Sequence, residues 1–169
     1  KSGAITIGAR GILVAYNVNI DEKEAVVAKK IGSLVRSTGR LIKQEDGRKM
    51  RIGGMLKMVQ GMGVPLETHG ISQVSMNLRD VEQCPMHVAF EACKSIAGDH
   101  GVDAPGSELV GLVPLAAMLV SGRWYAEDGV TDESILVREA IKGLGLDSLG
   151  VFHPQQRIIE WALHEAVSQ

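Results

Sequence analysis

Apolar and polar residues alternate along two separated segments of the chain, Ile12–Ile20 and Ile71–Leu78. Successive side chains of a β-strand point to opposite faces of a sheet, so this period predicts two half-buried strands. The first segment has one apolar face and a second face that becomes polar at Asn17 and Asn19. In the second segment, the face opposite the apolar one carries Gln73, Ser75 and Asn77.

The remaining periodicity places these strands in a defined order. Helical spacing of apolar residues follows each of them, and apolar runs predict two more strands, Met55–Gly63 and Glu108–Val113. The order strand, helix, strand, strand, helix, strand is that of the α+β ferredoxin-like βαββαβ sandwich. We therefore expect an antiparallel sheet with both helices on one face and the two alternating segments in its centre.

Capping and turn residues predict where the helices begin and end. Asp21 with Glu24 three residues later is typical of a capping box, and Pro85 suits the first turn of the second helix. Val64-Pro65 should end the preceding strand, because proline cannot donate to the ladder. Three further helices should form a C-terminal extension, and they should begin at Pro114, Asp132 and Pro154.

Composition limits the classes of function. The 169 residues are one domain's worth of chain, and 18 basic against 20 acidic residues argue against a nucleic-acid partner, which needs a basic face. The longest uncharged run, Leu109–Gly122, contains Pro114 and is shorter than the about 20 residues of a membrane span. With only Cys84 and Cys93 as cysteines and no signal-peptide pattern, we expect a cytoplasmic protein.

The uncharged polar face has two interpretations. It is either an ordinary solvated face or a surface lining a cleft, where short amides and hydroxyls orient a polar ligand. His87, in the first turn of the second helix, is either a packing histidine or a ligand contact. No histidine falls in a zinc-binding spacing, so no metal is predicted.

Two other segments stand out. Gly39–Gly54 is loop-like and carries five basic and two acidic residues within residues 40–51, a net charge of +3. It is either a solvated loop or a surface attractive to carboxylates. Gly143–Ser148 is either an anion-binding turn or the C-cap of a helix. No set of residues forms a convincing catalytic group.

Five strings carry a family resemblance. They occur in one order and extend from Gly8 to about Glu160. The chain resembles the C-terminal subdomain of glutamate formiminotransferase, in the strings GARGILVAYNVNI (8–20), LKMVQGMG (56–63), QVSMNL (73–78), GSELVGLVP (106–114) and GLDS (145–148).

The resemblance implies transfer of a formimino group from N-formimino-L-glutamate to N5 of tetrahydrofolate, in histidine breakdown. Such enzymes have two α/β subdomains with folate in a positively lined tunnel between them, and the domain is fused to a cyclodeaminase in animals. The family's catalytic histidine lies in the N-terminal subdomain, in a His-Pro-Arg-Ile-Gly string that this chain lacks. No catalytic residue is therefore assigned. A chain beginning at Lys1 would be the second half of the enzyme, with the N-terminal subdomain as partner and a homodimer possible.

Combined with the alternation and the charge, the resemblance predicts a substrate-binding surface. The amides and hydroxyl of the polar face would form part of the wall of the folate tunnel. Lys57, Gln60 and the loop residues Arg40, Lys43 and Arg48 would attract the glutamyl carboxylates of folate. The predicted substrate-binding residues are Asn17, Asn19, Lys57, Gln60, Gln73, Ser75, Asn77 and His87.

Three alternatives stay open. One is a transferase for another formimino donor, because donor contacts can lie on the other subdomain. Another is a non-catalytic ligand-binding or assembly module on the same sandwich. The last is an RNA-binding sandwich, which would need aromatic residues on the sheet face, where only Tyr16 is available, on the presumed helix side.

Overall fold

The computed structural model of the protein describes residue 3 and residues 11–167. Its main feature is a four-stranded antiparallel sheet in the order β4, β5, β1, β6. These strands span Val59–Leu66, Ile71–Leu78, Val14–Ile20 and Gly106–Val110, respectively. The two alternating segments lie side by side in the centre, so the ferredoxin-like βαββαβ prediction is confirmed.

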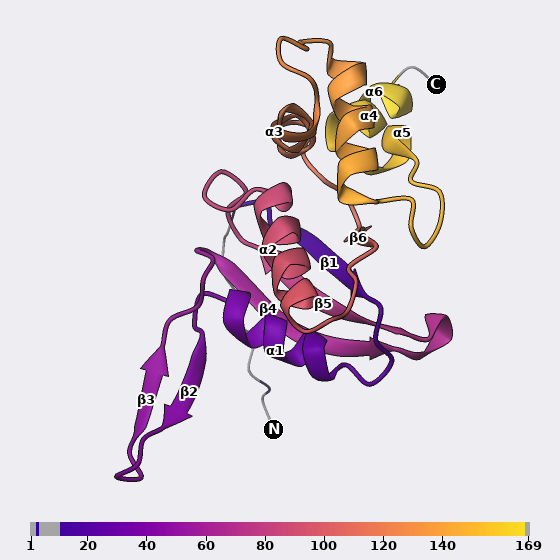
Figure 1. Cartoon of the computed structure of the whole chain (residues 1–169). Coiled ribbons are helices and arrows are strands. Elements are labelled where there is room, and N and C mark those ends of the chain that lie inside the picture. The colour runs from indigo at the N-terminus through magenta and orange to yellow at the C-terminus, as the bar shows by residue number, and fades with distance from the viewer. Residues whose placement is uncertain (1–2, 4–10, 168–169) are drawn as a thin grey trace.

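Two helices cover one face of this sheet, α1 (Val26–Val35) and α2 (Met86–Asp99) (Figure 1). We call this the inner face. α1 lies so close to β4 that a Cβ atom at Gly63 would be 2.1 Å from the backbone nitrogen of Lys29, which explains the glycine there. The inner-face residues of the two central strands are almost fully buried: Val14, Tyr16, Val18, Ile20, Ser72, Val74, Met76 and Leu78.

The predicted helical extension is present at the β6 edge of the sheet (Figure 1). It consists of α3 (Leu115–Tyr125), α4 (Glu133–Leu144), α5 (Pro154–Arg157) and α6 (Ile159–Val167). The end of α4 is tied to β6, because the Ser107 hydroxyl donates to the Leu144 carbonyl at 2.6 Å. The extension is therefore part of the same packed body as the sheet.

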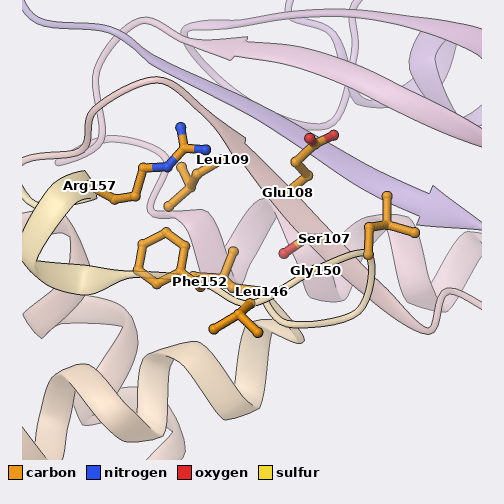
Figure 2. A pocket seen from close by; sticks show the side chains of 9 residues that line it. Ser107, Glu108, Leu109, Leu146, Gly150, Phe152 and Arg157 are labelled. Carbon is orange, nitrogen blue, oxygen red and sulfur yellow. The ribbon is translucent and has the colours of Figure 1, made fainter.

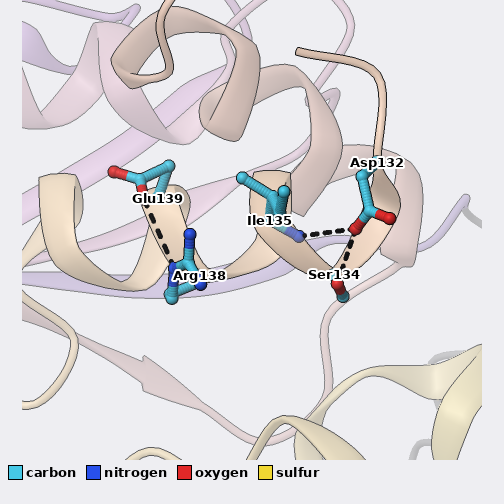
Figure 3. A network of polar contacts seen from close by, with 5 residues as sticks. All are labelled: Asp132, Ser134, Ile135, Arg138 and Glu139. Carbon is cyan, nitrogen blue, oxygen red and sulfur yellow. Dashed lines mark hydrogen bonds and ion pairs between the residues drawn. The ribbon is translucent and has the colours of Figure 1, made fainter.

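Asp132 caps α4 as predicted (Figure 3). Its Oδ1 accepts hydrogen bonds from the Ser134 hydroxyl at 2.5 Å and from the Ile135 backbone N–H at 3.0 Å. These bonds stabilise the charged form and lower the pKa of the Asp132 carboxyl. At the other end of α4, Gly145 adopts a φ of 61°, and its backbone N–H donates to the carbonyl groups of Ile141 and Lys142. The Gly143–Ser148 turn thus contains the predicted helix C-cap.

The basic segment differs from the prediction. It is a β-hairpin rather than a loop, formed by β2 (Arg40–Lys43) and β3 (Lys49–Ile52). The hairpin projects from the body of the molecule near the start of β4 (Figure 1). Almost all of its residues are exposed, so neither face shows the buried alternation by which a strand is recognised.

Several predicted boundaries were also wrong. β4 was expected to end at Val64-Pro65, but it runs through Pro65, which is tolerated because β4 is an edge strand. The first strand was expected to begin at Ile12, but Ile12 lies outside β1 and is 62% exposed. Glu22 rather than Asp21 caps α1, since its carboxylate accepts from the backbone N–H groups of Val26 and Val27. The last helix is interrupted at Ile158, which forms a parallel bridge with Val113.

The short 3-10 helix η1 (Glu67–His69) connects β4 to β5. It ends at Gly70, whose φ of 66° is a left-handed conformation that favours glycine. This tight connection fixes the register of the two strands, from Leu66 opposite Ile71 to Val59 opposite Leu78.

Candidate functional site

Polar side chains gather on the sheet face opposite α1 and α2. Residues that are paired across antiparallel strands project from the same face, and the register pairs Asn17 with Ser75 and Gln60 with Asn77. The alternation argument is therefore confirmed for the central strands. We call this surface the polar face and define it as Asn17, Asn19, Gln60, Gln73, Ser75, Asn77 and Glu108.

Gln73 is the hub of a hydrogen-bond network on the polar face. Its Nε2 donates to Asn19 Oδ1 at 2.8 Å and to Glu108 Oε2 at 3.0 Å. Its Oε1 accepts from Asn17 Nδ2 at 3.2 Å. Gln73 is only 3% exposed, so these partners satisfy its amide where water does not reach. Its role is to hold the surrounding side chains in place.

Asn19 extends this network to the C-terminal extension. It is fully buried, and its Nδ2 donates to the Ser148 hydroxyl at 2.9 Å. Ser148 lies directly over β6, because a Cβ atom at Gly106 would be 2.4 Å from the Ser148 hydroxyl. The α4–α5 connection therefore covers the end of the polar face that contains Asn19 and Gln73.

The other end of the polar face is open. Asn77 and Ser75 are half-buried, Gln60 is exposed, and the Asn77 amide lies 3.5 Å from Gln60 Oε1. Met62, which the register places beside Ser75, is 60% exposed. Four residues of the polar face can thus contact a ligand: Asn17, Ser75, Asn77 and Gln60. Of these, Asn17 is held by Gln73, which is itself bonded to Asn19 beneath the α4–α5 connection.

Glu108 is the site residue that the sequence analysis missed. It pairs with Asn17 and brings a carboxylate to a face that was expected to carry no charge. The segment was interpreted as a uniformly buried strand, although Ser107 and Leu109 alternate with Glu108 and Val110 in burial. The sequence itself does not alternate there, and the available signal was the charge of Glu108 beside the apolar residues that follow it. With Glu108, the polar face offers neutral donors and acceptors and one anionic acceptor.

This combination can bind and orient a polar ligand. The seven residues of the polar face include no histidine, cysteine or lysine. The face therefore suits recognition by hydrogen bonds, and Glu108 is its one carboxylate, a group type that also acts as a general base in enzymes. Within residue 3 and residues 11–167, no group of three His, Cys, Asp or Glu side chains is placed to hold a metal ion.

Comparison with known proteins decides the family. Residues 15–164 match the profile of the family described as the formiminotransferase domain. The chain belongs to the formiminotransferase domain family. The resemblance in the five sequence strings is thereby confirmed.

Named relatives of this formiminotransferase-domain chain are much longer than it is. The formimidoyltransferase-cyclodeaminase of Dictyostelium discoideum is 40% identical over 96% of this chain and 29% of its own length. That of Mus musculus is 39% identical over 97% of this chain and 29% of its own length. The glutamate formimidoyltransferase of Streptococcus pyogenes serotype M1 is 35% identical over 75% of this chain and 38% of its own length. The chain thus spans less than half of each.

The predicted cationic residues of this formiminotransferase-domain chain lie beside the open end of the polar face or beyond it. Lys57 is exposed in the turn that precedes β4, two residues before Val59, which pairs with Leu78 of β5. Arg40, Lys43 and Arg48 are exposed on the β2–β3 hairpin, and Arg48 pairs with Asp46 at 3.3 Å. Lys57 precedes by three residues Gln60 of the polar face, whereas the hairpin projects from the body of the molecule (Figure 1).

His87 is separated from the other predicted site residues. It lies on α2, on the helix-covered side of the sheet, and its ring stacks on Trp124 of α3 with centroids 5.1 Å apart. Burial lowers the pKa of His87, an effect opposed by the nearby Glu91 carboxylate. Its surroundings are those of a packing histidine, so the structure does not bring it to the polar face.

Two further observations concern the state of the cysteines and the length of the helices. Cys84 and Cys93 are both buried and free, and burial raises the pKa of the Cys84 thiol to about 11. In the described part of the chain, no helix is long and apolar enough to cross a membrane.

Proposed function

We propose that this chain is the C-terminal subdomain of an enzyme that moves a formimino group from N-formimino-L-glutamate to tetrahydrofolate in histidine degradation. Its polar face would form one wall of the tunnel that holds the folate. Membership of the formiminotransferase domain family supports the reaction class. Residues 1–169 would be one folding unit, with an N-terminal subdomain as its partner.

One observation carries the proposal. The polar face combines an open row of hydrogen-bonding groups with a network around Gln73 that holds Asn17, one member of that row. Asn17, Ser75 and Asn77 are partly accessible, and Asn17 is held by the Gln73 amide, which is itself held by Asn19 and Glu108. Such preorganisation suits a rigid heterocycle with its own donors and acceptors, such as the pterin ring of a folate.

The reaction needs two substrates held in contact. The N5 amine attacks the formimino carbon, a new N5–C bond forms, and the bond between that carbon and the glutamate nitrogen breaks. The proton lost from N5 ends on the departing amine, which leaves as L-glutamate. A base must move this proton, and we place it on the N-terminal subdomain. The present chain would bind and orient the folate.

Basic side chains at the margin of the polar face would attract the glutamyl carboxylates of the folate. Lys57, near Gln60 and Asn77, is placed to attract a glutamyl carboxylate. The more distant Arg40, Lys43 and Arg48 would act by long-range attraction, which salt screens beyond about 10 Å. Cytoplasmic residence and a homodimer are further proposals. The two free cysteines support a reducing compartment.

The test is a transfer assay with both halves of the enzyme. Release of L-glutamate from N-formimino-L-glutamate should require tetrahydrofolate and both subdomains. Replacing N-formimino-L-glutamate with formimino-glycine should greatly reduce the rate of transfer if the glutamate compound is the natural formimino donor. If the assembled halves are folded and release no glutamate, the transferase proposal is wrong and a ligand-binding or assembly module is favoured.

A further inference from the structure

A small cavity opens beside the free edge of β6. It has a volume of about 130 Å³ and lies between β6 and the connection from α4 to α5. The connection is fixed there, since the Phe152 backbone N–H donates to Asp147 Oδ1 at 2.7 Å. The cavity is thus built into the fold. Its lining residues are Ser107, Glu108, Leu109, Leu146, Leu149, Gly150, Val151, Phe152 and Arg157.

Two opposite charges line this cavity, from Glu108 and Arg157 (Figure 2). In Figure 2 the Arg157 guanidinium lies beside Leu109, and the Glu108 carboxylate lies further along β6. Neither side chain has an ion-pair partner in the described ranges, where the recorded pairs involve other residues. Both charges are therefore available to a ligand that carries the complementary charges at two ends.

Arg157 is held in position by its backbone and its side chain. Its carbonyl accepts the Val113 N–H at 2.9 Å, and its Nη1 donates to the Gly111 carbonyl at 3.3 Å. The remaining guanidinium donors match the two oxygens of a carboxylate. The side chain is otherwise exposed, and its bond to Gly111 restricts the guanidinium before a ligand binds.

The free edge of β6 adds a backbone donor. The Ser107 N–H points outward from the sheet to the Gly145 carbonyl at 3.1 Å. Backbone groups two residues apart on a strand point the same way, so the Leu109 N–H also faces outward, into the cavity that Leu109 lines. Arg157 and Leu109 both line the cavity, and a guanidinium and a backbone N–H are each donors to carboxylate oxygens.

Size defines what the cavity can hold. A cavity of about 130 Å³ is smaller than the about 300–1,000 Å³ of a typical ligand pocket, so it takes a small group rather than a whole cofactor. A carboxylate and the next carbons fit, whereas a bicyclic pterin does not. Leu146, Leu149 and Phe152 supply the apolar lining that suits the methylene groups of such a chain.

Glu108 connects the cavity to the polar face. Its Oε2 accepts from Gln73, a member of that face, and Glu108 also lines the cavity. A ligand anchored at Arg157 would therefore bring its cationic nitrogen to Glu108, next to the folate wall. A formamidine nitrogen is cationic when protonated and pairs well with a carboxylate.

We infer that this cavity binds an amino acid with one carboxylate on Arg157 and the Leu109 N–H and its cationic nitrogen on Glu108. Its identity as the formimino donor, and as the L-glutamate that leaves, rests on the proposed function. The inferred charge pattern of the ligand does not rest on the proposed function, because it follows from the residues that line the cavity. The further site residues are thus Glu108 and Arg157, of which Arg157 lies off the polar face.

The test compares Arg157→Gln with Arg157→Lys and with Arg138→Gln, a matched control on α4. In the enzyme assembled from both halves, Arg157→Gln should raise the KM for N-formimino-L-glutamate by about 10- to 100-fold, the range for a lost charged hydrogen bond. The KM for tetrahydrofolate should stay within about twofold, Arg157→Lys should recover part of the loss, and Arg138→Gln should behave as wild type. Calorimetric titration of L-glutamate into the same proteins measures the cavity directly.

The outcomes separate the two proposals. An active wild type with an unchanged donor KM in Arg157→Gln overturns the cavity assignment and leaves the transferase proposal intact. A wild type without transferase activity overturns the proposed function. The cavity is then decided by titration, where L-glutamate binding that Arg157→Gln weakens supports it and absence of binding contradicts it. Unfolding midpoints equal to wild type exclude misfolding of the variants.

Discussion

The two faces of the sheet share the same strands but follow different rules. On the inner face, one row contains Tyr16, Met76 and Leu109, all buried beneath the helices. On the polar face, the next row contains Asn17, Ser75 and Glu108, which are partly accessible. Residues that are neighbours in sequence thus lie alternately in the core and on a polar, partly accessible face.

The difference separates stability from recognition. Inner-face residues gain their free energy from apolar burial and close packing, so volume decides which residue is tolerated. Polar-face residues gain little from apolar burial, and four of them are joined by hydrogen bonds centred on Gln73: Asn17, Asn19, Gln73 and Glu108. Substitutions on the two faces should therefore change different measurements.

The largest effect on stability is expected from Leu78→Ala. Leu78 is fully buried between Val14 and Val59 on the inner face, and its truncation leaves a cavity. The free energy of unfolding should fall by about 2–5 kcal/mol, measured by urea denaturation. A loss below about 1 kcal/mol would contradict the assignment of this face to the core.

Gln73→Ala should have an intermediate effect. It removes the donor to Asn19 and Glu108 and the acceptor for Asn17 in a site that is only 3% exposed. Leaving these groups unpaired should cost about 1–3 kcal/mol in unfolding free energy. Ser75→Ala, on the same strand and face, is the matched control and should cost less. Equal losses in the two variants would argue against the network.

A smaller effect is expected from protonation of His87, because no side-chain volume is removed. Burial against Trp124 lowers its pKa in the folded state, so the unfolded chain binds the proton more readily. Stability should therefore fall as the pH decreases below the unfolded value of about 6.5 towards the folded pKa. Urea denaturation between pH 7.5 and pH 5 measures this slope, which should be flatter in His87→Phe. An unchanged slope would show that His87 is solvated.

The smallest effect on stability is expected from Asn77→Ala. Asn77 is adjacent to Leu78, faces the open end of the polar face and contacts Gln60 at 3.5 Å. Its truncation should change the free energy of unfolding by no more than about 0.5 kcal/mol. A larger loss in the same urea series would mean that the polar face is structural rather than a binding surface.

Strict periodicity made much of the fold predictable. β5 and α2 were identified because burial imposes a period of two on a strand and of 3.6 on a helix. The β2–β3 hairpin was not, because its exposed strands bury neither face. The interruption at Ile158 depends on a bridge to Val113, a tertiary contact that no local pattern encodes.

The candidate site divides in the same way. Alternation, together with the βαββαβ order that makes the two strands neighbours, placed Asn17, Ser75 and Asn77 on one face. It did not reveal that Asn19 is buried beneath Ser148, which lies 129 residues further along the chain. His87 was assigned from its distance in sequence to Asn77, although α2 places it on the other side of the sheet.

The central claim is that the polar face binds a reduced folate. Its most direct test is calorimetric titration of tetrahydrofolate into the two assembled subdomains, comparing wild type with Asn77→Ala and with Val120→Ala, an exposed control on α3. We predict saturable binding that Asn77→Ala weakens and Val120→Ala leaves unchanged. Equal affinity in all three folded proteins would contradict the assignment of the polar face to folate.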